Sequence, residues 1–165
     1  MYQKLFKLIN KKLMIKIDVF VQDKNWKKYI PNPSGYINHK KKYIKSVLDS
    51  LKIKKINFSI LLAGNTEIKN LNKKFRKKNK STDVLSFPFY NTEDLKKNKN
   101  KNIYIGDIVL NFKKIDKKNF KMDFNRLWIH GFLHLLGYKH FKDKDFYKMN
   151  KLEKKILKKI IGNQC

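Results

Sequence analysis

The segment His130–His140 constrains this chain more than any other part of its sequence. Three of the four histidines in the 165 residues fall within it. On a helix, His130 and His134 are about one turn apart and present their imidazoles on the same face. Gly137 follows them, and a glycine can take the left-handed conformation that ends a helix and turns the chain back. That turn would bring His140 to the same point, so the spacing predicts a three-histidine metal site on a helix and the turn after it.

Zinc is the ion that three neutral imidazoles favour, and a fourth position left open for water is typical of a catalytic site. The same spacing occurs in zinc peptidases, where a glutamate general base follows the first histidine. Gly131 stands at that position. A zinc metallopeptidase is therefore the weaker enzymatic alternative, and its base would have to come from elsewhere, such as Asp83, Asp107 or Glu153. A glycine inside a helix costs about 1 kcal/mol relative to alanine, which indicates close approach of a backbone or a substrate at Gly131.

Hydrophobic periodicity predicts an α+β sandwich, with a mixed sheet of about four strands covered by helices. The expected strands are 12–22, 55–64, 82–89 and 103–112, and Pro88 suggests an edge strand. Helices are expected over 39–51, from Asn65 or Thr66 to Phe75, from Asp123 or Asn125 through the histidines, and from Met149 to Gly162. Residues 25–38 and 93–102 are expected to be loops because of their turn-forming or low-complexity composition.

The chain is predicted to hold one domain, residues 14–165, preceded by a basic N-terminal extension, residues 1–13. Its formal charge is +28, carried by 39 lysines and two arginines. RNA is a natural partner for such a charge, but a lysine-rich composition can also arise with no partner. The single cysteine, Cys165, fits a reducing, cytoplasmic setting, and no stretch is long enough for a membrane span.

The segment His130–His140 resembles the signature of the YbeY family, bacterial endoribonucleases and ribosomal RNA maturation factors. A second block, Leu71-Asn72, Phe75-Arg76 and residues 82–87, resembles the arginine-containing block of that family, and Gly106-Asp107-Ile108 resembles its central strand. The likeness extends over roughly residues 14–161.

The resemblance implies a metal-dependent endoribonuclease that holds zinc through His130, His134 and His140 and uses Arg76 as its functional arginine. It also implies single-stranded RNA as substrate, a role in maturing the 3′ end of small-subunit ribosomal RNA and in ribosome quality control, and the ribosome or its small subunit as partner. One departure is Lys139, where the family usually has an aspartate before the third histidine.

We expect the ion and Arg76 to face each other across an RNA-binding cleft, since a guanidinium can hold a phosphate with two parallel hydrogen bonds. Lys77, Lys78 and Lys80 would then follow the RNA backbone. Asp83 and Asp107 are candidates for supporting the metal ligands. Nearby aromatic side chains could stack on bases but are expected to belong to the core: Phe75, Phe87, Phe89 and Tyr138.

The sequence leaves open which nucleophile attacks phosphorus and whether the zinc is catalytic. Either a water or the neighbouring 2′-hydroxyl could attack phosphorus. A third hypothesis for the function is a non-catalytic ribosome assembly factor in which zinc only stabilises the fold.

Overall fold

A computed structural model describes residues 13–98, 101–139 and 143–162 and contains a four-stranded mixed sheet. The strands are arranged in the order β1-β2-β4-β3: β1 Met14–Val21, β2 Lys55–Ala63, β4 Asn102–Asn111 and β3 Val84–Pro88. The first three strands in that order are parallel, and β3 pairs with β4 in the antiparallel direction. The predicted four-stranded mixed sheet is confirmed, and Pro88 ends an edge strand, where a missing backbone N–H is tolerated.

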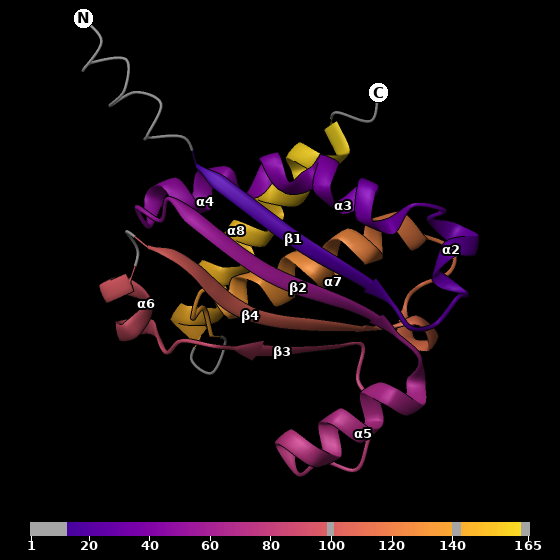
Figure 1. The fold of residues 1–165 in the computed structure, drawn as a ribbon. Coiled ribbons are helices and arrows are strands. Elements are labelled where there is room, and N and C mark those ends of the chain that lie inside the picture. The colour runs from indigo at the N-terminus through magenta and orange to yellow at the C-terminus, as the bar shows by residue number, and fades with distance from the viewer. Residues whose placement is uncertain (1–12, 99–100, 140–142, 163–165) are drawn as a thin grey trace, which may run out of the picture.

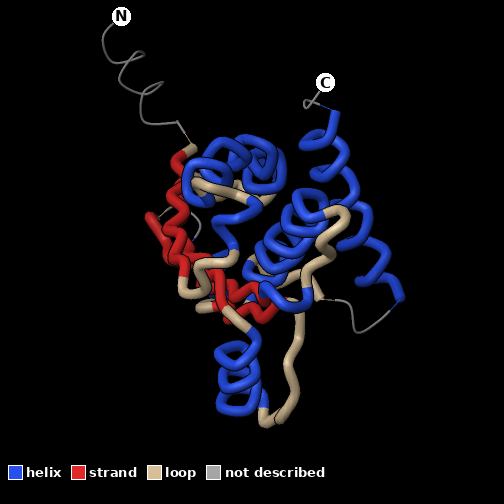
Figure 2. The backbone as a smooth tube through the Cα atoms, turned by 90° about the vertical axis from the view of Figure 1, so that its right-hand side faces the viewer, coloured by secondary structure: helices blue, strands red, loops and turns tan. Residues whose placement is uncertain are grey.

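The helices are distributed unequally about this sheet. Figures 1 and 2 show α3, α4, α7 and α8 on one face, whereas α5 projects beyond the end of β2. The helices and 3-10 segments (η) are α2 Trp26–Tyr29, α3 Pro33–Lys40, η1 Lys41–Ile44, α4 Lys45–Ser50, α5 Asn65–Arg76, α6 Thr92–Asn98, η2 Phe112–Lys114, α7 Phe120–Leu135 and α8 Asp143–Gly162. None of the helices in the described part of the chain is long and apolar enough to cross a membrane.

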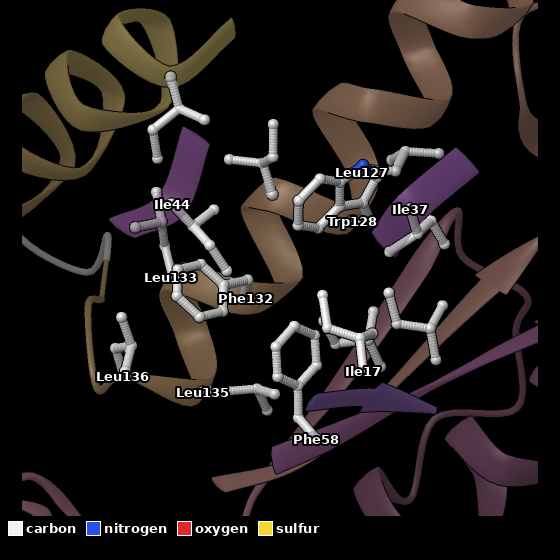
Figure 3. Packing of buried hydrophobic residues seen from close by; sticks show 14 of the residues in the cluster. Ile17, Ile37, Ile44, Phe58, Leu127, Trp128, Phe132, Leu133, Leu135 and Leu136 are labelled. Carbon is white, nitrogen blue, oxygen red and sulfur yellow. The ribbon is translucent and has the colours of Figure 1, made fainter. Parts of the chain in front are cut away.

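Helix α7 is the most deeply buried element on the covered face. Its side chains Leu127, Trp128 and Phe132 are fully buried, and Figure 3 shows Phe132 close to Phe58 of β2. Leu133 of the same helix and Ile44 of η1 belong to one buried cluster, and both are labelled in Figure 3. The histidine-bearing helix is therefore held from several sides, and only one flank of it reaches solvent.

Two segments that the sequence suggested were loops are helical. Residues 25–38 contain α2 and most of α3, where Pro33 occupies the first turn and the Asn32 side chain accepts a hydrogen bond from the Gly35 N–H at 2.9 Å. Residues 93–98 belong to α6, where the Asn91 side chain accepts from the N–H groups of Glu93 and Asp94. The loop predictions were wrong because asparagine caps and an initial proline start a helix as readily as they form a turn.

Several predicted boundaries also differ. The helix expected over 39–51 is divided among the end of α3, η1 and α4, and α7 begins at Phe120 after Asn119 rather than after Asp123 or Asn125. Gly64 precedes α5, in place of Asn65 or Thr66. The C-terminal helix starts before Met149, at Asp143. The proposed extension 1–13 lies outside the described residues except for Leu13.

The glycine inside α7 is explained by the sheet. A Cβ atom built on Gly131 would lie 2.7 Å from Cγ2 of Ile108, a fully buried β4 side chain. Because a β-branched side chain has few alternative rotamers, Ile108 cannot easily make room. The close approach that the sequence indicated is therefore made by the sheet, and the helix lies deeper than any larger residue at position 131 would allow.

Replacement of Gly131 by alanine should lower the free energy of unfolding by about 1 kcal/mol. Overpacking of a core costs about 1–3 kcal/mol, and the better helix propensity of alanine returns only about 1 kcal/mol. Urea unfolding of Gly131→Ala beside Gly162→Ala checks this, because a Cβ on Gly162 meets no atom of the described residues beyond its own stretch of helix within 4 Å. Equal stability of the two variants would contradict this account of the contact.

Candidate functional site

A cleft of about 1250 Å³ opens between the edge strand β3 and the C-terminal half of α7. Alternate residues of β3 line it, namely Val84, Ser86 and Pro88. Leu85, between them, belongs to a small cluster on the other face of the sheet. The opposite wall carries His130 and His134 on α7 and then Gly137, Tyr138 and Lys139 in the following turn.

The two helical histidines lie against each other in this cleft. Their Nε2 atoms are 3.1 Å apart, and their ring centroids are separated by 4.7 Å at an interplanar angle of 78°. The predicted convergence of His130 and His134 on one point is confirmed. His140 lies outside the described residues, and among the described ones no group of three histidine, cysteine or acidic side chains is placed to hold an ion.

Each imidazole is oriented by an acceptor at its other nitrogen. Nδ1 of His130 lies 2.9 Å from Oε2 of Glu153 on α8, and Nδ1 of His134 lies 2.8 Å from the backbone carbonyl oxygen of Tyr138. A carboxylate and a carbonyl can only accept, so both Nδ1 atoms carry the proton. When both rings are neutral, both Nε2 atoms present lone pairs toward each other.

This donor arrangement fits a metal ion. Two facing lone pairs at 3.1 Å repel unless a proton or a metal ion lies between them. Two nitrogens bound at about 2.0–2.1 Å to one tetrahedral ion are separated by about 3.3 Å, close to the spacing in this structure. Histidine ligands whose second nitrogen donates to a carboxylate or carbonyl are the usual arrangement at metal centres.

The turn that leads toward His140 has the predicted conformation. Helix α7 ends at Leu135, and Gly137 adopts a φ of +86°. A Cβ atom at Gly137 would lie 2.6 Å from Oγ1 of Thr92. Glycine is therefore required twice, for the left-handed backbone and for the contact with the first residue of α6.

Arg76 reaches the same cleft from the other wall, although it is far from the histidines in sequence. It is the last residue of α5, is exposed, and donates from Nη2 to the Ser86 carbonyl oxygen at 3.0 Å. Of the three lysines expected to follow RNA, Lys78 lines the cleft. Lys77 instead ends α5 in the left-handed conformation, with its ammonium 3.3 Å from the Lys74 carbonyl oxygen. Lys80 is exposed in the loop that follows and is not among the lining residues.

The two acidic candidates are in different places. Asp83 lines the cleft, and its Oδ1 accepts from the Val84 N–H at 2.9 Å. Arg126 approaches the other oxygen of Asp83 at 3.7 Å and also binds Asp123, so this second arginine links α7 to the start of β3. Asp107 lies outside the cleft lining.

Asp107 takes part in a separate polar network. Its carboxylate accepts hydrogen bonds from the Tyr104 hydroxyl at 2.5 Å and from the Ser59 hydroxyl. Burial, followed by the bond to Asp107, raises the pKa of the Tyr104 phenol. These contacts keep the Asp107 side chain engaged away from the histidines, so they lend no support to its expected role beside the metal ligands.

The aromatic side chains near the cleft divide into two groups. The expectation of a core location is wrong for Phe89 and Phe75, which are 67% and 57% exposed. Phe87 is half-buried and packs against the small cluster behind β3. Tyr138 is half-buried at the cleft wall, where burial raises the pKa of its phenol.

Sequence reasoning did not identify Glu153 as the partner of His130. No spacing rule pairs a residue on α8 with a histidine on α7, since that contact depends on how the two helices pack. Lys139, the departure from the family pattern, is exposed and lines the cleft. It therefore adds a positive charge to the wall that carries the histidines.

Comparisons with known proteins identify the family to which the chain belongs. The family described as "Endoribonuclease YbeY" matches residues 20–161. The "Endoribonuclease YbeY" of Pelagibacter ubique is 46% identical over 153 residues, which cover 89% of this chain and 97% of that protein. That of Buchnera aphidicola is 42% identical over 141 residues, 81% of this chain and 84% of its own. A solution structure of a Thermotoga maritima protein has a TM-score of 0.59 and 25% identity, and covers 92% of this chain and 91% of its own. The chain belongs to the YbeY endoribonuclease family.

Proposed function

We propose that this chain is a metal-dependent endoribonuclease that cuts single-stranded RNA in ribosomal RNA processing, with the 3′ end of small-subunit ribosomal RNA as its target. The observation that carries the proposal is that one cleft contains the paired histidines on one wall and Arg76 on the other. A metal centre and a guanidinium are the two groups that phosphodiester cleavage needs most, one for the reacting oxygens and one for the phosphate charge.

The proposed ion is zinc, one per chain, held by His130, His134 and His140. The first two supply Nε2 lone pairs whose direction is fixed by Glu153 and by the Tyr138 carbonyl oxygen. An all-imidazole set suits zinc better than the hard cations magnesium and calcium, which prefer oxygen ligands. When bound, zinc supplies a Lewis acid and lowers the pKa of its water to about 7.

The chain's own residues then bind and orient the RNA. Arg76 is anchored through one nitrogen to Ser86, which leaves other N–H donors of its planar group for a phosphate. Lys78 and Lys139 add positive charge on opposite walls of the cleft. The Tyr138 hydroxyl offers one more hydrogen-bond donor at the histidine wall. Asp83 is proposed to act indirectly, by fixing the start of β3 through Arg126.

The glutamate base that zinc peptidases use has no place at position 131, so the base of the peptidase alternative would still have to come from Asp83, Asp107 or Glu153. That position faces Ile108 of the sheet, and there is no room even for a Cβ atom. A glutamate general base therefore could not stand next to the first histidine without moving α7 off the sheet.

The ribosome, and its small subunit in particular, is the proposed partner, and the cytoplasm the proposed location. A net charge of +28 favours a polyanionic assembly through counterion release, which makes such binding sensitive to salt. The charge therefore supports a partner that contains RNA, because ribosomal RNA is the polyanion that an rRNA-processing enzyme meets.

Charge reversal at Arg76 should abolish RNA cleavage and leave the fold intact. Loss of a preorganised donor to a reacting phosphate lowers the rate about 100-fold or more, whereas the lost bond to Ser86 costs only about 0.5–1.5 kcal/mol of stability. Single-turnover cleavage of a single-stranded RNA measures the first effect and urea unfolding the second. Lys73→Glu is the matched control, since it makes the same charge change on an exposed residue of α5 outside the cleft. If the Arg76→Glu protein still cleaved RNA, Arg76 would have no role in the mechanism.

His134→Ala should lose both the ion and RNA cleavage but remain folded. Its imidazole is half-buried at the cleft wall and is not part of the main core. Elemental analysis should find one zinc per chain in the parent protein, and a chelator should stop cleavage without changing circular dichroism. His39→Ala, an exposed histidine on α3, serves as the control that keeps both properties. Unfolding of His134→Ala or of the chelated protein would favour the purely structural zinc of the assembly-factor alternative.

Glu153→Gln should weaken zinc binding about 10- to 100-fold, the usual effect of losing a group that orients a metal ligand. The amide can still contact Nδ1 of His130 but no longer carries the charge that fixes the proton there. Competition with a chelator of known affinity measures the binding. The nitrogen chemical shifts of the metal-free imidazole report whether His130 still keeps its proton on Nδ1. Glu67→Gln on α5, outside the cleft lining, should change neither, and unaltered zinc affinity in Glu153→Gln would rule out the orienting role.

A further inference from the structure

Phe89 is exposed over 67% of its surface and lines the cleft just beyond the end of β3. A single exposed phenylalanine on a protein surface is common and needs no function. Phe89 differs from the other exposed aromatic residues in three respects. These are its position in the cleft, the contacts that hold its ring and the positive charges around it.

The ring is held in place without being covered. The Phe89 N–H donates to the Ile105 carbonyl oxygen at 3.0 Å, so the backbone continues the pairing of β3 with β4. The ring meets Tyr90 at 5.0 Å and Tyr104 at 6.1 Å between centroids, with interplanar angles of 75° and 71°. Edge-to-face contacts of this kind fix the orientation of a ring while much of its surface stays exposed.

The surroundings suit a nucleic acid better than an apolar ligand. Arg76, Lys78 and Lys139 line the same cleft, and each carries a positive charge. Proteins that bind single-stranded nucleic acid combine such charges, which follow the phosphates, with aromatic rings on which bases stack. A base inside a duplex is already stacked and paired, so a fixed ring on a cleft wall can accept only an unpaired base.

We propose that Phe89 is a stacking platform for one unpaired base of the RNA substrate, beside the phosphate held by Arg76. The inference rests on the proposed RNA-cutting function and deepens it, because it gives a physical reason why the substrate is single-stranded. Every base has a flat face, so this subsite selects for the absence of pairing and only weakly for sequence.

Two other exposed phenylalanines provide comparisons within the chain. Phe20 is 58% exposed but lies on β1, at the sheet edge opposite to β3. Phe75 precedes Arg76, yet its ring packs against Phe87 at 5.3 Å and is not among the residues that line the cleft. Phe20 is thus a matched control in residue type and exposure.

The test combines substitutions in the protein with removal of single bases from the RNA. Cleavage of a short single-stranded RNA is measured for the zinc-loaded parent protein and for Phe89→Ala, Phe89→Trp and Phe20→Ala. The same RNA is also prepared with an abasic nucleotide at each position in turn. Phe89→Ala should raise KM about tenfold, within the range that loss of one stacked base produces, and leave kcat nearly unchanged. Phe89→Trp should retain the parent KM, and Phe20→Ala should behave as the parent protein.

The decisive result is non-additivity. At one abasic position the parent protein should lose as much affinity as Phe89→Ala loses on intact RNA, and the two changes together should cost no more than either alone. The stacking proposal would be overturned if Phe89→Ala had the KM of the parent protein. It would also be overturned if the losses of affinity from Phe89→Ala and from base removal were additive at every abasic position. Thermal unfolding followed by circular dichroism verifies that the variants are folded.

The outcome is separable from that of the proposed function. If Arg76→Glu retains full cleavage while Phe89→Ala shows the base-dependent loss, the assigned phosphate site is wrong and the base subsite stands. If the parent protein cleaves RNA and Arg76→Glu does not, an unchanged Phe89→Ala protein overturns only the stacking proposal.

Discussion

The contact between Gly131 and Ile108 sets the distance between α7 and the sheet. Since no Cβ atom separates them, the helix lies directly on β4, and its large side chains fill the space on either side. His130 precedes this glycine and His134 follows it by three residues, so both sit on the flank of a helix whose depth is fixed. The width of the cleft between α7 and β3 follows from the same contact.

The site depends on elements that are distant in sequence and belong to different layers. The edge strand β3, with the end of α5 bound to it, forms one wall. The other wall is α7, and α8 holds the first histidine in its orientation through Glu153. Each wall alone carries only some of the proposed functional side chains. The packing of α7 between the sheet and α8 therefore decides whether the histidines and Arg76 face one another.

The sequence was sufficient for the features that depend on local spacing. Helical periodicity placed His130 and His134 together, and the left-handed turn at Gly137 follows from the residue itself. Alternation located β1 and β2, and the other two strands were also expected at their places in the chain. The segments 25–38 and 93–102 were predicted to be loops from their turn-forming and low-complexity composition. That prediction overlooked Asn32 and Asn91, whose side chains accept from nearby N–H groups and start helices. The exposure of Phe89 and the contact of Glu153 with His130 result from tertiary packing, which no local pattern encodes.

The free edge of β3 has a consequence for self-association. Residues 84, 86 and 88 direct their backbone groups away from β4, where an unpaired edge would invite a strand from another molecule. The Val84 N–H is bound by the Asp83 side chain, the Ser86 carbonyl oxygen is bound by Arg76, and Pro88 has no N–H to offer. At each of three successive outward positions, one backbone group is thus unavailable for strand addition. The same side chains that border the cleft therefore discourage this chain from aggregating through the edge of its sheet.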